Sequence, residues 1–127
     1  MLLLLLLQLQ LQLPQLPRLT SSSWSPPLKN MMAEISSRGP ITCTIGCPET
    51  LENYTGGVYK DLSGDKSPDH DIEVTGYGTE NGVDYWHVRN SWGVYWGEQG
   101  WFRIVRGVDN LGIESQECSW AVPTKVW

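Results

Sequence analysis

Apolar and polar positions follow a helical spacing and then several strand-like spacings from Lys29 onward. Met31, Met32 and Ile35 fall on one side of a helix, which predicts a short helix over Met31–Ile35. Gly39-Pro40 follows, and this pair ends a helix because proline cannot continue it.

Alternating apolar residues then predict a series of short strands. In the first, Ile41, Cys43 and Ile45 fall on one face and threonines on the other. Gly56-Gly57 marks a turn before Val58-Tyr59. The further strands expected are Asp71–Tyr77, Val83–Arg89, Trp101–Val105 and the two short segments Gly112–Glu114 and Ser119–Val122.

The connection Gly78–Gly82 contains an Asn-Gly pair, which is typical of a tight turn between antiparallel strands. Strands outnumber the one leading helix, and no internal repeat is visible. The pattern therefore predicts an α+β fold, a mostly antiparallel β-sheet or barrel domain with one leading helix.

Residues 1–28 form a low-complexity leader rich in Leu, Gln, Pro and Ser, and we expect it to be disordered or helical. Its leucine run, Leu2–Leu7, has the apolar centre of a secretory signal peptide, but no basic residue precedes it. Ser21–Ser23 is the nearest candidate for a cleavage site. The leader is therefore read as a signal peptide or as a mistaken gene start, and residues 29–127 as one domain.

Charge and composition exclude several classes of partner. The chain has 127 residues and a formal net charge of −5, from 9 Lys and Arg against 14 Asp and Glu. A nucleic-acid binder would need a basic face, so we expect no nucleic-acid partner. No stretch has the length and apolarity of a convincing membrane span, so we expect no stable membrane insertion.

One histidine and one asparagine occupy neighbouring strand ends. His70 begins the strand before the Asn-Gly turn, and Asn90 follows the strand after it. An antiparallel hairpin brings the start of one strand beside the end of the next, so these side chains are expected to meet. An amide oxygen can hold one imidazole nitrogen while the other faces a thiol, which suits thiolate catalysis. Trp92, two residues on, is positioned to cover that hydrogen bond.

The cysteines are compatible with one disulfide and one remaining thiol. There are three, Cys43, Cys47 and Cys118, with no CxxC pair, so a structural zinc site is not expected. Asn53-Tyr54-Thr55 is a glycosylation sequon and points, like a disulfide, to a secreted or lumenal protein.

The second histidine is interpreted as structural. His87 alternates with Trp86 and Val88, so it decorates the opposite face of its strand. In Asp69-His70-Asp71, neighbouring residues on a strand point to opposite faces, so no metal site is expected there.

A longer motif resembles the papain family of cysteine peptidases. Asn90–Trp101 reads Asn-Ser-Trp-Gly-Val-Tyr-Trp-Gly-Glu-Gln-Gly-Trp and resembles the family's Asn-Ser-Trp-Gly-x-x-Trp-Gly-x-x-Gly signature. Asp69–Gly78 resembles the family's histidine strand, and Gly39-Pro40-Ile41 resembles its crossover into the second domain. The resemblance covers about residues 30 to 122 and implies the C-terminal, mostly β, domain of the papain fold.

Within the family, the chain is most similar to the cathepsin X/Z subgroup. Met32–Ile35 and Glu52–Tyr59 read like that subgroup, and Leu111 stands where most members have a cysteine. The resemblance implies a Cys43–Cys118 disulfide, a glycan on Asn53 and a lysosomal or secreted location.

The resemblance also implies roles for individual residues. His70 would be the general base and acid, and Asn90 would orient it. Trp92 would shield their hydrogen bond, Trp96 would line the leaving-group side of the cleft, and Asp69 would line its wall. The expected partners are a peptide or protein substrate and the family's helical domain, with no cofactor.

The family's nucleophilic cysteine and oxyanion-hole glutamine lie in that helical domain, and no Gln…Cys-Gly-x-Cys-Trp pattern occurs in this chain. We therefore expect a cysteine-type peptidase whose nucleophile is missing from this chain. Carboxypeptidase specificity is implied by the subgroup resemblance alone, and endo- and exopeptidase clefts both stay open. Two alternatives stay open: a catalytically inactive fragment, and an aromatic-rich β binding module.

Overall fold

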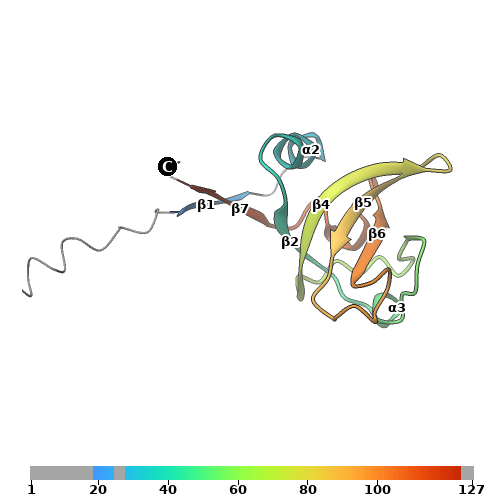
Figure 1. The fold of residues 1–127 in the computed structure, drawn as a ribbon. Coiled ribbons are helices and arrows are strands. Elements are labelled where there is room, and N and C mark those ends of the chain that lie inside the picture. Colours follow the sequence, from blue (N-terminus) through green and yellow to red (C-terminus); the bar gives the residue numbers. More distant parts are fainter. Residues whose placement is uncertain (1–18, 25–27, 124–127) are drawn as a thin grey trace, which may run out of the picture.

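Backbone pairing joins seven strands of the computed structural model into one mixed sheet (Figure 1). The structure describes residues 19–24 and 28–123. The strand order is β1-β7-β2-β4-β5-β6-β3, and every neighbouring pair is antiparallel except β3 and β6. The strands are β1 (Leu19–Trp24), β2 (Ile41–Ile45), β3 (Val58–Tyr59), β4 (His70–Glu80), β5 (Val83–Arg89), β6 (Trp101–Val105) and β7 (Cys118–Pro123).

The described residues form fewer helices than strands. Helix α2 (Leu28–Ser37) packs against β2 and β4 through Met31 and Ile35, as the helical spacing predicted. It is longer than the predicted Met31–Ile35 segment at both ends and, as expected, it ends before Gly39. The single-turn helix α3 (Glu49–Glu52) was not predicted, because only Leu51 of its four residues is buried and no apolar periodicity marks it.

The alternation in β2 works as the sequence predicted. Ile41, Cys43 and Ile45 are buried, whereas Thr42 and Thr44 between them reach the opposite face. The same inner face continues across the sheet and forms the core, whose central side chains are Ile72, Val74, Trp86, Val88, Phe102 and Ile104. The α+β, mostly antiparallel class expected from the sequence is confirmed.

The leader does not behave as expected where the structure describes it. Leu19–Trp24 forms strand β1 and pairs along its whole length with β7, from Leu19 opposite Pro123 to Trp24 opposite Cys118. The expectation of a disordered or helical leader is therefore wrong for this segment. Backbone hydrogen bonding to an otherwise open strand edge, rather than side-chain alternation, determines the pairing. Residues 1–18, with the leucine run, lie outside the described residues.

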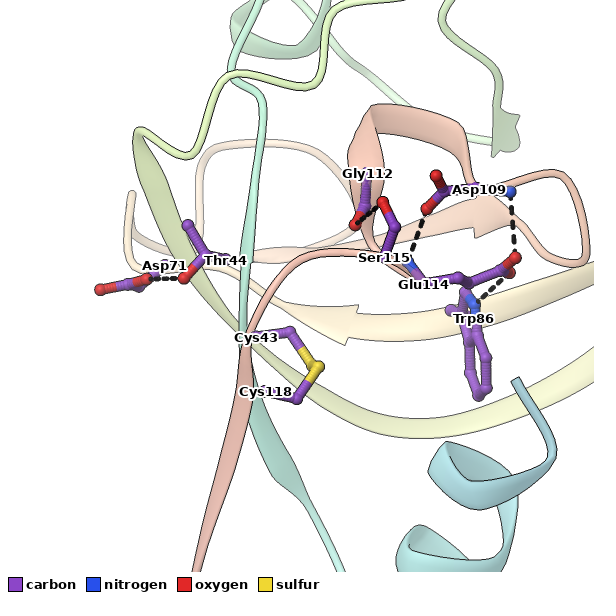
Figure 2. Close-up of a disulfide and its surroundings, with 9 residues drawn as sticks. All are labelled: Cys43, Thr44, Asp71, Trp86, Asp109, Gly112, Glu114, Ser115 and Cys118. Carbon is purple, nitrogen blue, oxygen red and sulfur yellow. Dashed lines mark hydrogen bonds between the residues drawn. A yellow bond between two sulfur atoms is a disulfide. The ribbon is translucent and has the colours of Figure 1, made fainter. Parts of the chain in front are cut away.

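A second correction concerns Gly112–Glu114, which is not a strand. A 3₁₀ turn, η1 (Asn110–Gly112), occupies the region, and Leu111 and Gly112 have φ values of 53° and 76°, which an extended strand does not allow. Glu114 fixes this turn, because its carboxylate accepts hydrogen bonds from the Trp86 indole at 3.0 Å and the Asp109 backbone at 3.0 Å (Figure 2). The buried Trp86 thereby satisfies its only side-chain donor.

The hairpin between β4 and β5 is tighter than the sequence suggested. Only Asn81 and Gly82 form the turn, with φ values of 51° and 79°, and the strands continue up to Glu80 opposite Val83. Two consecutive positive φ values favour an Asn-Gly pair. The turn fixes the β4–β5 register, and that register determines which residues meet at the far end.

A disulfide ties β2 to β7 at the centre of the molecule. Cys43 and Cys118 lie directly opposite each other in the two strands and are bonded (Figure 2). Both are 1% exposed, and the bridge closes a sequence separation of 75 residues. The disulfide expected from the family resemblance is therefore present.

Backbone hydrogen bonds within residues 90–100 close the β5–β6 connection into a compact loop. The Asn90 N–H donates to the Gly100 carbonyl at 2.9 Å, and the Gly100 N–H donates to the Trp96 carbonyl at 2.7 Å. Gly97 is required within it, because its φ is 56° and a Cβ there would lie 2.6 Å from the Trp101 carbonyl oxygen.

Glu98 links this connection to β6 and to Gly57, the residue before β3. Its carboxylate accepts two hydrogen bonds from the Arg103 guanidinium, at 2.7 and 3.0 Å, and one from the Gly57 N–H at 3.0 Å. The hydrogen bonds from Arg103, partly opposed by burial, hold the pKa of Glu98 below its ordinary value.

No helix in the part of the chain that the structure describes is long and apolar enough to cross a membrane.

Replacing the disulfide in a Cys43→Ala/Cys118→Ala variant is expected to lower the free energy of unfolding by about 4 kcal/mol, because the bridge constrains a long loop in the unfolded chain. Urea unfolding of the full chain measures this. Cys47→Ala is the matched control, since Cys47 is a free cysteine, and should change stability by less than about 1 kcal/mol. Equal losses in both variants would contradict the structural role of the bridge.

Glu98→Gln is expected to lower the free energy of unfolding at neutral pH by about 1 to 2 kcal/mol, because a charged bidentate pair becomes a weaker contact. A carboxylate with a depressed pKa stabilises the fold above its unfolded pKa, and that contribution is lost as pH falls through the folded pKa. The difference between wild type and variant should therefore shrink below about pH 4. Denaturant unfolding at a series of pH values checks this, and a difference independent of pH would refute it.

Candidate active site

The β4–β5 register brings His70 and Asn90 together at one end of the sheet. Glu73 pairs with Arg89, so continuing the register by one residue sets Asn90 opposite Ile72. His70 and Ile72 share a face, which makes His70 the diagonal neighbour of Asn90. The His70 Nε2 and Asn90 Oδ1 atoms lie 2.9 Å apart, as the hairpin argument from the sequence expected.

The Asn90 side-chain oxygen has a second donor that fixes its orientation. The Ser91 backbone N–H donates to the same Oδ1 at 2.7 Å. Because a backbone N–H needs an acceptor, Oδ1 rather than Nδ2 must face both groups. In the neutral imidazole Nε2 therefore carries the proton, and Nδ1 is left as a hydrogen-bond acceptor. This contribution of Ser91 comes from the main chain, so no side-chain pattern could have revealed it.

Trp92 lies over the imidazole. The His70 and Trp92 rings stack with centroids 4.8 Å apart and an interplanar angle of 25°. Asn90 is 8% exposed and Trp92 is 37% exposed, so a mostly buried amide lies beside a partly exposed indole. A hydrogen bond in such a setting is stronger than one in water.

Trp96 connects Trp92 to the core. Its ring meets Trp92 edge to face at 5.0 Å and Phe102 at 5.7 Å, and its indole N–H donates to the Glu52 carbonyl at 2.8 Å. Helix α3 therefore helps to position the site, although it was not predicted from the sequence. Figure 1 shows α3 beside the β5–β6 connection at this end of the sheet.

A hollow of about 310 Å³ opens next to Asn90 on the outer face of β2, β4 and β5. Asn90 Nδ2 is buried and has no hydrogen-bond partner among the described residues. The residues that line the hollow are mostly polar: Thr42, Asp71, Ile72, Glu73, Arg89, Asn90 and Ser91.

Neither aspartate beside His70 is seen to hydrogen-bond to the imidazole in the described residues. Asp69 is exposed just before β4, where its N–H donates to the Ser67 carbonyl at 3.0 Å. Asp71 is on the outer face and accepts a hydrogen bond from the Thr44 hydroxyl at 2.8 Å (Figure 2). Among the described residues, no group of three His, Cys, Asp or Glu side chains is arranged to hold a metal ion.

Cys47 is the one free cysteine of the three and has the wrong environment for a nucleophile. Burial raises the pKa of its thiol, and the nearby charges of Asp69, Glu52 and Asp65 raise it further. A reactive cysteine needs neighbours that stabilise the thiolate, and these do the opposite.

His87 and Asn53 each contact residues of the surrounding strands or helix. His87 faces away from the buried Trp86 and Val88, stacks on Trp101 at 4.8 Å and lies 3.1 Å from the Thr75 hydroxyl. Asn53 is exposed at the end of α3, where its side chain donates to the Glu49 carbonyl at 3.0 Å.

Comparison with known proteins assigns the chain to one family. Residues 18–121 match the family model for papain family cysteine proteases. Cathepsin Z of Onchocerca volvulus is 45% identical over 105 residues, which cover 76% of this chain and 34% of that protein. A gut-specific cysteine proteinase of Caenorhabditis elegans is 46% identical over 86 residues, covering 68% of this chain and 26% of the relative.

Solved structures agree with the sequence matches. The digestive procathepsin L2 proteinase from Tenebrio molitor larval midgut superposes with a TM-score of 0.76 at 32% identity, covering 90% of this chain and 36% of that structure. The chain thus spans about a quarter to a third of the curated relatives it matches, and its described residues carry the C-terminal, sheet-rich part of their fold. The chain belongs to the papain family of cysteine proteases.

Proposed function

We propose that this chain supplies the histidine–asparagine half of a cysteine peptidase active site. The observation that carries the proposal is the hydrogen bond between His70 Nε2 and Asn90 Oδ1, covered by the Trp92 ring. It leaves Nδ1 as the one imidazole nitrogen available to a thiol. The substrate is a peptide or protein.

In the proposed reaction, a cysteine thiol transfers its proton to His70 Nδ1 and becomes a thiolate. The thiolate attacks the peptide carbonyl carbon, and the imidazolium then gives its proton to the leaving amine as the carbon–nitrogen bond breaks. Water, deprotonated by the same nitrogen, hydrolyses the acyl-enzyme and restores the thiol. Asn90 keeps the ring oriented through both proton transfers without adding a negative charge.

The proposal assigns the nucleophile to a helical domain outside this chain. Cys43 and Cys118 are bonded to each other, and the pKa of Cys47 is raised, so none of the three suits the role. We therefore expect the chain alone to be inactive.

The finer assignments follow from the similarity to cathepsin Z. They are carboxypeptidase specificity, a lysosomal or secreted location, a glycan on the exposed Asn53, and substrate contacts from Asp69, Trp92 and Trp96. The leader, residues 1–28, keeps its two interpretations, a signal peptide or a mistaken gene start.

Reconstitution tests the proposal. The full chain is co-refolded with the cysteine-bearing N-terminal part of Onchocerca volvulus cathepsin Z, and hydrolysis of a peptide substrate is followed. We expect thiol-dependent hydrolysis that His70→Ala lowers about 10²- to 10⁴-fold in kcat/KM, because general acid–base catalysis is lost.

His87→Ala is the matched control, since His87 is also a half-buried histidine stacked on an indole. It should leave kcat/KM within about threefold of wild type, because the ring is remote from the reacting atoms. Hydrolysis by the chain alone, or a His70→Ala mixture as active as wild type, would refute the proposal.

A further inference from the structure

His87 is a half-buried histidine that the candidate active site does not use. It lies in the middle of β5, on the sheet face opposite the core, where its ring stacks on Trp101 at 4.8 Å with an interplanar angle of 12°. Its Nδ1 atom lies 3.1 Å from the Thr75 hydroxyl oxygen. Histidine is the side chain that ordinarily gains a proton as the pH falls from about 8 to about 5. This part of the sheet can therefore change its charge in mildly acidic solution.

Thr75 determines which nitrogen of the neutral ring carries the proton. The Thr75 hydroxyl donates to the His87 backbone carbonyl at 3.1 Å, and it has only one hydrogen to give. Towards the ring the hydroxyl oxygen is therefore an acceptor, so Nδ1 of the neutral imidazole carries the proton. Protonation in acid adds a hydrogen to Nε2 and leaves the bond to Thr75 intact. The ring thus gains a charge while it stays in place on Trp101.

Two guanidinium groups flank His87 on this face of the sheet. Arg89 lies two residues along β5, about 6.6 Å away between Cα atoms. Arg103 lies directly opposite His87 in β6. The titratable or charged side chains that surround the ring on β4, β5, β6 and the connection before β6 are Glu73, Glu80, Tyr85, Arg89, Glu98 and Arg103.

The two guanidinium groups are held very differently. Arg103 is 2.7 Å from the Glu80 carboxylate and 2.7 Å from the Glu98 carboxylate, and its side chain is 18% exposed. Arg89 is 63% exposed, and its nearest carboxylate, Glu73, is 3.6 Å away, which is too long for a hydrogen bond. Arg89 is therefore the cation that can move.

The same indole carries both His87 and Arg89. The Arg89 guanidinium carbon lies 5.9 Å from the centroid of the Trp101 ring on which His87 stacks. With His87 neutral, Arg89 is the only cation of the two, and the ring attracts it. Once His87 is charged, two cations contact one ring, and they repel each other because like charges at this separation are only partly screened.

We propose that His87 is a pH-sensitive switch that controls the position of Arg89. Protonated His87 displaces the Arg89 guanidinium from the Trp101 ring, and the guanidinium closes on the Glu73 carboxylate. Glu73 is the acceptor because it pairs with Arg89 in the β4–β5 register and already lies within 3.6 Å. This inference goes beyond the proposed peptidase reaction and does not depend on it.

The switch changes the surface beside Asn90. Arg89 and Glu73 both line the polar hollow there, so closing their ion pair alters the charge that the hollow presents in acid. At neutral pH the ring is uncharged and Arg89 stays on Trp101. Neutral pH is therefore the condition at which His87→Ala serves as a control for activity.

NMR of the isotopically labelled full chain, titrated from about pH 8 to about pH 5, tests the switch. The side-chain protons of Arg89 are shifted upfield while the guanidinium lies over the indole. We expect most of this shift to be lost along the same titration curve as the ¹⁵N signals of the His87 ring. His87→Gln, whose amide can still donate to Thr75 but cannot gain a charge, should keep the upfield shift across the whole range.

His70→Gln is the matched control, because the chain has two histidines and this variant removes the other one. It should preserve the pH-dependent step. An Arg89 shift that does not change with pH in the wild-type chain, one that follows the titration of His70, or one that is still lost in His87→Gln would each overturn the proposal. Should His87→Gln fail to fold, the curves of the wild-type and His70→Gln chains decide the matter by themselves.

Discussion

The hydrogen bond between His70 and Asn90 depends on the turn and register of the β4–β5 hairpin and on the connection that follows β5. The two-residue Asn81-Gly82 turn determines which residues of β4 and β5 face each other, and a slip of one position would turn one side chain to the wrong face. The closed connection from Asn90 to Gly100 then holds the amide in place. With Oδ1 held by Ser91 as well, the imidazole has one stable orientation, and its free nitrogen follows from that orientation.

A series of packed aromatic rings, called a ladder here, connects the buried core to this hydrogen bond. Phe102 is fully buried, Trp96 packs on it, Trp92 meets Trp96 edge to face, and His70 stacks on Trp92. Burial decreases from Phe102 through Trp96 to Trp92, and the half-buried imidazole packs on this exposed end of the series. A catalytic group needs this position because it must be both oriented and accessible.

Much of the fold could be predicted from the sequence where side-chain alternation determines the structure. Strands β2, β5 and β6 match their predicted bounds, because each alternates buried and outward residues. Where the main chain determines the structure, prediction failed. Strand β1 has no alternation and forms through backbone pairing with β7, and η1 replaces an expected strand because Leu111 adopts a positive φ.

In the candidate site, too, the features that depend on side chains could be predicted and those that depend on the main chain could not. The meeting of His70 with Asn90 follows from the hairpin, and the covering ring of Trp92 follows from its place two residues on. The hydrogen bonds that hold Asn90 and Trp96 in place could not be predicted from the side-chain pattern, because the Ser91 N–H and the Glu52 carbonyl belong to the main chain.

The tautomer of His70 tests the account most directly. Imidazole ¹⁵N chemical shifts of the full chain, recorded above the titration of the ring, distinguish a protonated Nε2 from a protonated Nδ1. The geometry predicts that neutral His70 carries its proton on Nε2, and that Asn90→Ala lets the two tautomers mix. A proton on Nδ1 in the wild-type chain would leave no acceptor for a thiol and would contradict the central claim.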